Sequence, residues 1–293
     1  MMKSVIKRVI VAILLCVLVF SVAKIITYFE QKAEAEHMQR DIIHEHVTPE
    51  SSETTDPVVS EDEEQPANAD TTDEDEEPAQ EQSTAPTVSQ APVTTGGSAV
   101  APADGSDGVS VDFSSLRARY PDVVGYIYSP GTRIQYPIAY MSSNNDFYLN
   151  RDLDGNLNVN GSIFIEHLNS PNFSHQNTII YGHHMKSGLM FADLCKYKDA
   201  SYYSSHPYMY IYTPEQDYRI DLFAACVVES VSDIYSFEPS SEVLWSCINS
   251  STFDADIDYP ENRIVTLSTC TYEYDDARYV VLGELVPIEV EWE

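Results

Sequence analysis

No lysine or arginine occurs between Arg40 and Arg117, whereas 19 aspartates and glutamates fall within residues 41–116. The other residues of this stretch are mostly Thr, Ser, Pro, Ala and Gln. Such a segment cannot bury enough apolar surface to offset the entropy of ordering its backbone. We therefore predict that residues 30–108 form a disordered acidic tether, which as a coil would span on the order of 50 Å.

The net charge of the chain limits the classes of function that it can have. Lys and Arg number 16 against 47 Asp and Glu, a formal net charge of −31. Phosphate contacts need clustered cations, so this balance excludes a nucleic-acid-binding protein. Residues 117–293 carry 10 basic and 25 acidic residues and are only moderately acidic. We expect one folded domain, over residues 109–293.

Residues 9–29 form an almost unbroken apolar run, interrupted only by Lys24. About 20 apolar residues suffice to cross a bilayer as a helix, and a lysine near one end can snorkel. Three basic residues precede the run, so we predict a cytoplasmic N-terminus, a single membrane-spanning anchor within residues 1–29 and an extracellular domain. A cleaved signal peptide is the alternative, although its weak A-x-A pattern at 33–35 lies beyond the run.

Eight short runs after the acidic stretch are rich in β-branched and aromatic residues and mostly bounded by turn formers. They are residues 123–128, 134–140, 161–166, 178–181, 208–213, 218–230, 263–268 and 278–287. Helices are expected at 111–120, 189–196 and 240–248. Many short strands with few helices predict a mainly β fold, closed or nearly closed into a barrel.

Three side chains at predicted strand ends are candidates for catalysis. Cys270 ends one run and His183 follows another, while Arg278 opens the run after the polar loop 271–276. A nucleophilic thiolate needs a base or a cation nearby. Antiparallel pairing through the loop would place Arg278 beside Cys270, where a guanidinium can hold a carbonyl or stabilise an oxyanion.

The other four cysteines occur in apolar surroundings. Cys16 lies in the apolar run, and we expect Cys195, Cys226 and Cys247 to be buried and reduced. An extracellular location leaves a Cys226–Cys247 disulfide as an alternative.

These motifs resemble those of sortases. Residues 266–270 (TLSTC) and the following Arg278 resemble the T-L-x-T-C signature and its arginine, and residues 181–185 (YGHHM) resemble the sortase histidine motif. Three further segments are similar to class B sortases in particular: residues 121–138, 145–149 and 161–165. The likeness extends over about residues 111–293.

The resemblance implies a sortase-type closed β-barrel of about eight strands, with short N-terminal and inserted helices. It also implies a membrane-anchored cysteine transpeptidase of a Gram-positive bacterium, working without cofactor or metal. Cys270 would attack the Thr–Gly or Thr–Asn bond of a C-terminal sorting signal and form a thioacyl-enzyme. An amine of a peptidoglycan precursor, or of a pilin, would then release the surface protein. His183 would act as general acid and base, and Arg278 would stabilise the intermediates.

Further residues match family positions in the substrate groove. They are Ser268, Asn145, Leu149 and Tyr235. The motif register favours His183 over the adjacent His184 as the catalytic imidazole. Acidic residues of the 271–276 loop suggest a preference for cationic sorting signals.

Several other functions compete with this interpretation. A hydrolytic cysteine protease would use the same nucleophile and base, and a tethered non-catalytic adhesin would suit the anchor. A zinc site from His183, His184, His206 and a cysteine is disfavoured, because adjacent strand residues face opposite ways and no C-x-x-C or H-E-x-x-H spacing occurs. Pilin-polymerising sortases usually carry a C-terminal membrane segment, and no apolar run occurs near Glu293.

Overall fold

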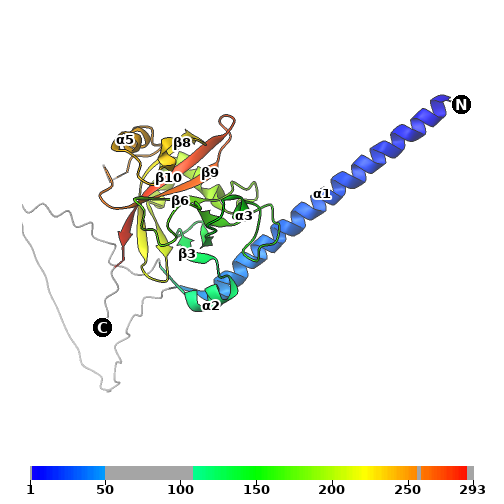
Figure 1. The fold of residues 1–293 in the computed structure, drawn as a ribbon. Helices are drawn as coiled ribbons and strands as arrows, with labels where there is room; N and C mark the ends of the chain where they lie inside the picture. Colours follow the sequence, from blue (N-terminus) through cyan, green and yellow to red (C-terminus); the bar gives the residue numbers. More distant parts are fainter. Residues whose placement is uncertain (1, 50–107, 256–258, 289–293) are drawn as a thin grey trace, which may run out of the picture. The chain divides into compact units, whose positions relative to one another are not determined.

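Eight strands close into a barrel in the computed structural model, which describes residues 2–49, 108–255 and 259–288. Figure 1 shows the barrel. Its strands are hydrogen-bonded in the order β10-β8-β7-β3-β4-β5-β6-β9. Their bounds are β3 Val123–Tyr128, β4 Gln135–Ala139, β5 Ile163–Ile165, β6 Asn177–Tyr181, β7 Tyr208–Tyr212, β8 Tyr218–Glu229, β9 Ile264–Cys270 and β10 Ala277–Pro287. This closed mainly β fold confirms the predicted architecture, and each predicted run overlaps one of the strands, with differences of one or two residues at the ends.

The pairing is mixed. β4–β5 and β6–β9 are parallel, and the other neighbours in the barrel are antiparallel. β9 therefore lies between a parallel partner, β6, and an antiparallel partner, β10. The ends of β6 and β9 point the same way, which brings the residues that follow them to one edge of the barrel.

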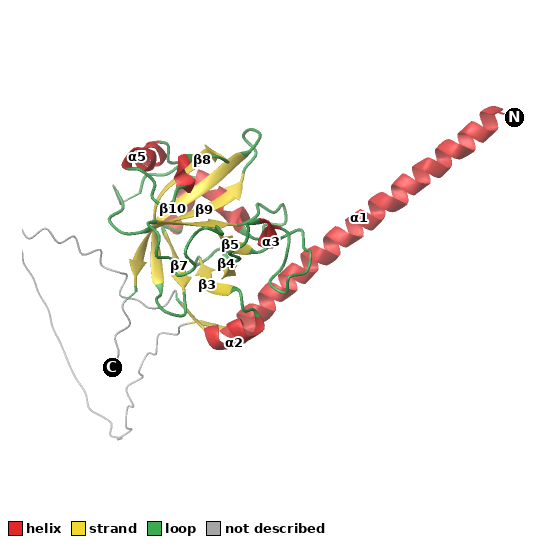
Figure 2. Cartoon of the chain, in the orientation of Figure 1, coloured by secondary structure: helices red, strands yellow, loops and turns green. Residues whose placement is uncertain are grey.

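Short helices connect the strands (Figure 2). They are α2 Phe113–Arg119, α3 Asp146–Leu149, α4 Ala200–Ser205, α5 Ser241–Asn249 and the 3₁₀ helices η1 Phe191–Lys198 and η2 Asp233–Tyr235. Side-chain caps set where several of them begin. Asp112 accepts hydrogen bonds from the main-chain N–H groups of Ser114 and Ser115, and Ser240 caps α5 through Val243 N.

The barrel has apolar clusters on both sides of β9. Leu267 belongs to the cluster inside the barrel, while Ile264 belongs to a second cluster that includes Leu244 of α5. A strand covered on both faces reads as a continuous buried run rather than an alternating one. All of β9 except Cys270 is accordingly buried.

The N-terminal part of the chain differs from the prediction. Helix α1 runs from Met2 to His46, well beyond the apolar run, and a strand β1 (Val47–Pro49) follows it. β1 pairs in antiparallel fashion with β2 (Val109–Val111), whose last residue was predicted to begin a helix. The prediction of a disordered tether is therefore wrong for residues 30–49, and residues 50–107 lie outside the described residues.

Contacts with the barrel domain explain why residues 30–49 are ordered. Ile42 is only 3% exposed and packs in a cluster with Leu116 and Tyr126, and Met38 lies one turn earlier against the same cluster. Gln39 Nε2 donates to the main-chain carbonyl of Gln135 at 3.2 Å. Four-residue spacing of apolar side chains is the helix-face signal that the polar composition of this segment concealed.

Replacing Ile42 by Ala should lower the free energy of unfolding by about 2 kcal/mol or more, because a buried isoleucine leaves a cavity when truncated. Thermal unfolding of the full chain in detergent micelles measures the change. Ile26→Ala is the matched control, since Ile26 is exposed on the same helix. Equal melting temperatures for the two variants would show that α1 does not contribute to the folded domain.

Candidate functional site

Cys270 and Arg278 face each other across a hairpin. Cys270 is the last residue of β9, and the register of the β9–β10 ladder pairs it directly with Arg278. Main-chain hydrogen bonds from Thr271 N to Ala277 O and from Ala277 N to Tyr274 O close the connecting loop. The proximity predicted from the spacing of these two residues is confirmed. Both are partly exposed, so thiol and guanidinium are within reach of a ligand.

The parallel pairing of β6 with β9 brings His183 to the same place. Tyr181 is paired with Ser268, so the chain leaves β6 beside the last residues of β9. Gly182 is bonded on both sides, since its N–H donates to Ser268 O at 3.1 Å and its carbonyl accepts from Thr269 Oγ1 at 2.7 Å. His183 follows this fixed residue.

A hydrogen bond orients the imidazole of His183. Its Nε2 lies 2.7 Å from the main-chain oxygen of Leu149, at the end of α3. A carbonyl oxygen only accepts, so Nε2 carries the hydrogen and Nδ1 is the nitrogen left to exchange a proton. Gly161 permits this position of α3, because a Cβ there would lie 2.5 Å from Leu149 O, at a backbone φ of +58°.

The neighbouring His184 has different partners. Its Nδ1 lies 3.0 Å from the main-chain oxygen of Cys270 and 3.5 Å from Cys195 Sγ. His206 contacts the main-chain oxygen of Tyr202. Within the described part of the chain, no group of three or more His, Cys, Asp or Glu side chains is arranged to hold a metal ion.

One pocket of about 230 Å³ contains all seven predicted site residues. They are Cys270, His183, Arg278, Ser268, Asn145, Leu149 and Tyr235. Sequence reasoning did not single out the other five lining residues, which are Phe164, Tyr181, Gly182, Ser230 and Thr269. Tyr181 and Gly182 belong to the histidine motif at residues 181–185, so the sequence did contain a signal that these two residues lie at the site.

Two of these residues are bonded to each other. The hydroxyl groups of Tyr235, on η2, and Ser268, on β9, lie 2.8 Å apart. Burial raises the pKa of Tyr235 to about 12, so its hydroxyl keeps its proton near neutral pH. The contact fixes η2 against the pocket.

The loop after Cys270 is held by a lysine. Lys198 Nζ donates to Thr271 Oγ1 at 2.7 Å and forms an ion pair with Glu273. The hydrogen bonds that Glu273 accepts from Lys198 Nζ and from Thr271 Oγ1 lower the pKa of this carboxyl to about 2. The negative charge of Glu273 is therefore paired with the positive charge of Lys198. Of the three acidic residues in the loop, Asp275 and Asp276 are the ones on which the predicted preference for cationic signals would then depend.

All five cysteines are free thiols in the structure. Cys226 and Cys247 are buried in one apolar cluster, whereas Cys195 is only partly buried, contrary to the prediction. Contact with the Cys247 thiol and burial together raise the pKa of Cys226, which keeps that thiol protonated and unreactive.

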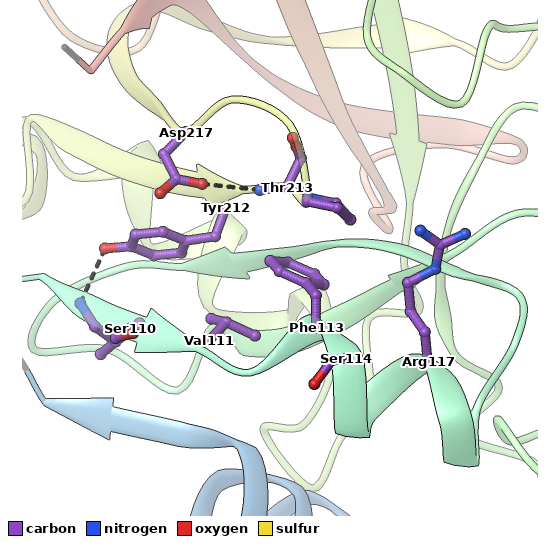
Figure 3. Close-up of a pocket in the computed structure, with 10 residues that line it drawn as sticks. Ser110, Val111, Phe113, Ser114, Arg117, Tyr212, Thr213 and Asp217 are labelled. Carbon is purple, nitrogen blue, oxygen red and sulfur yellow. Dashed lines mark hydrogen bonds between the residues drawn. The ribbon is translucent and has the colours of Figure 1, made fainter. Parts of the chain in front are cut away.

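A larger pocket, of about 620 Å³, lies between β2, α2 and the turn from β7 to β8 (Figure 3). In it the Tyr212 hydroxyl accepts from Val109 N and Asp217 accepts from Thr213 N. Its ten lining residues include neither cysteine nor histidine. The smaller pocket is therefore the candidate active site.

Comparison with known proteins agrees with this geometry. Residues 127–286 match the sortase domain. Sortase B of Listeria monocytogenes is 35% identical over 185 residues, which cover 60% of this chain and 74% of that protein. A Staphylococcus aureus sortase B–substrate complex superposes with a TM-score of 0.57 at 28% identity, covering 60% of this chain and 85% of that one. Clostridium perfringens sortase B gives a TM-score of 0.54 at 28% identity, covering 59% and 98%.

The chain belongs to the sortase family, in its B class. It is therefore a transpeptidase that acts on sorting signals.

Replacing Gly182 by Ala should destabilise the domain by about 1–3 kcal/mol and lower activity, because overpacking forces neighbouring groups to move. A Cβ at this position would lie 2.7 Å from the ring of Phe191 and closer still to Ile163. The strand end that carries His183 must then shift. Melting temperature and peptide-cleavage rate measure the two effects, and a variant with wild-type values for both would contradict the packing described here.

Proposed function

We propose that this enzyme cleaves a C-terminal sorting signal after a threonine and joins the surface protein to a peptidoglycan amine. Cys270 attacks the threonine carbonyl and the peptide bond breaks, which leaves a thioacyl-enzyme and a free amine. The acceptor amine then attacks the thioester and restores the thiol. Covalent catalysis divides one difficult acyl transfer into two easier steps.

The observation that carries this proposal is the meeting of Cys270, His183 and Arg278 at one pocket. Nδ1 of His183 is the atom that gives a proton to the departing amine and takes one from the incoming amine. The guanidinium of Arg278, across the ladder from the nucleophile, stabilises the negative oxygen of each tetrahedral intermediate.

The proposed location is the cell membrane. Helix α1 contains one segment that is long and apolar enough to cross a bilayer. Its apolar side chains, including Leu14, Leu18 and Phe20, are exposed. Basic residues before this segment support a cytoplasmic N-terminus and a barrel outside, where surface proteins and peptidoglycan precursors are found.

The full chain in detergent micelles should cleave some members of a library of quenched peptides with a central Thr–Gly or Thr–Asn bond. Added amines should convert the hydrolysis product into a transfer product, as mass spectrometry can detect. Cys270→Ala should abolish both products and the thioacyl-enzyme, because no other group in the pocket forms a thioester. Cleavage that is indifferent to every added amine would favour a hydrolase.

The two adjacent histidines provide a matched pair of variants. His183→Ala should reduce kcat by about 100-fold or more, since it removes the proton shuttle. His184→Ala should retain most of the activity, because that imidazole contacts the main-chain oxygen of Cys270 and the thiol of Cys195 instead of lining the pocket. Steady-state rates with the best-cleaved peptide decide between them, and the reverse ranking would assign the proton transfer to His184.

A further inference from the structure

Glu166 is a carboxylate buried behind the pocket, and none of the roles above uses it. It follows β5 directly and is 9% exposed. Its main-chain N–H donates to Ile179 O at 2.9 Å, so strand pairing fixes its backbone. A carboxylate this buried is tolerated only where donors satisfy its oxygens.

Two of those donors belong to the wall of the pocket. Glu166 Oε2 accepts from Asn145 Nδ2 at 2.5 Å and from the Tyr181 hydroxyl at 3.0 Å. Asn145 and Tyr181 both line the pocket that contains Cys270. Hydrogen bonds to an ionised acceptor are about twice as strong as neutral ones, so one oxygen fixes the orientation of two groups in the pocket.

The second oxygen of Glu166 and the amide oxygen of Asn145 both contact residues that follow Glu166 in the chain. Glu166 Oε1 accepts from Leu168 N at 3.5 Å and lies 2.6 Å from His167 Nδ1. Asn145 Oδ1 in turn accepts from His167 N at 2.8 Å. The bond from Asn145 Nδ2 to Glu166 and the bond from His167 N to Asn145 Oδ1 together define the orientation of the Asn145 amide. Its nitrogen must face Glu166 and its oxygen must face the main chain.

Tyr181 connects Glu166 with Tyr235, because its hydroxyl bonds to the carboxylate and its ring lies beside the ring of Tyr235. Burial and the charge of Glu166 raise the pKa of Tyr181, so its hydroxyl stays protonated and donates. The ring of Tyr181 lies 6.1 Å, centroid to centroid, from that of Tyr235. Tyr235 is bonded to Ser268, and the carboxylate therefore supports one end of a row of side chains that reaches β9.

We propose that Glu166 is a positioning residue for the substrate, which holds Asn145 and Tyr181 in the orientations that bind the sorting peptide. This inference rests on the proposed function to the extent that the peptide occupies the pocket of Cys270. Glu166 itself acts through its two partners, and we expect its removal to weaken binding much more than the chemical step.

The test compares peptide binding in the full chain carrying Cys270→Ala, with and without Glu166→Gln. Glutamine keeps the shape of the side chain but presents an N–H group to donors. The dissociation constant of the best-cleaved library peptide, measured by calorimetry, should rise about tenfold, the effect of losing a charge-assisted hydrogen bond. A change of less than about twofold would overturn the proposal.

Glu284→Gln is the matched control. Glu284 is a second buried carboxylate, 7% exposed, whose Oε1 accepts from Glu261 N, Asn262 N and Asn262 Nδ2. It is not among the lining residues of the pocket. Glu284→Gln should lower the melting temperature and leave peptide affinity unchanged, and an equal loss of affinity in both variants would reduce Glu166 to a structural role.

A mutant cycle distinguishes a positioning role of Glu166 from a general loss of structure. When Asn145→Ala and Tyr181→Phe are already present, Glu166→Gln should weaken binding no further, because both groups it positions are gone. An undiminished effect in that background would overturn the proposal. In the enzyme with Cys270 intact, Glu166→Gln should raise KM and leave kcat within about threefold.

Two further outcomes are distinguishable. If Glu166→Gln melts below the assay temperature, Tyr181→Phe replaces it, since it removes one of the two bonds between carboxylate and pocket and should weaken binding about threefold. Unchanged affinity in Tyr181→Phe would then overturn the proposal. Absence of a thioacyl-enzyme in the unmodified chain would count against the proposed function alone, because the binding comparison is made without Cys270 and would then use the library peptide that binds most tightly.

Discussion

The candidate active site depends on the hydrogen-bond register of β9. Its antiparallel ladder with β10 pairs Cys270 with Arg278, and its parallel ladder with β6 pairs Ser268 with Tyr181, two residues before His183. Cys270 and Arg278, which are close in sequence, and the distant His183 thus line one pocket because one strand has two neighbours. A slip of one residue in either ladder would turn every side chain of β9 to the opposite face. Burial on both faces of β9 prevents such a slip, since each face has its own apolar cluster.

Much of this arrangement could be predicted from the sequence. Strand runs between turn formers gave the eight barrel strands, and the loop from Cys270 to Arg278 was short enough to imply a hairpin. The position of His183 required more, because a parallel pairing between β6 and β9 joins segments more than eighty residues apart. Resemblance to the family supplied that step, and it also supplied Asn145, Leu149 and Tyr235.

Other features have no signal in a single sequence. Leu149 acts through its main-chain oxygen, which fixes the tautomer of His183 and is independent of side-chain identity. Glu166 looks like any acidic residue after a strand, and only the structure shows two groups from the pocket donating to it. The end of α1 was missed for a different reason, since Met38 and Ile42 supply a narrow apolar face within a polar composition.

The β1–β2 ladder argues against a spacer role for the long acidic sequence between Pro49 and Val109. Because Pro49 pairs with Val109, the chain departs from the folded domain and returns to it at adjacent positions. Insertions or deletions between these two points would leave the separation of bilayer and catalytic groove the same. In the proposed location, that separation would be set instead by the part of α1 between the end of the apolar run at residue 29 and its contacts with the barrel domain from Met38 onward, a rise of about 14 Å. An enzyme anchored in the proposed way would therefore work at a constant height above the membrane, whatever the number of residues between Pro49 and Val109.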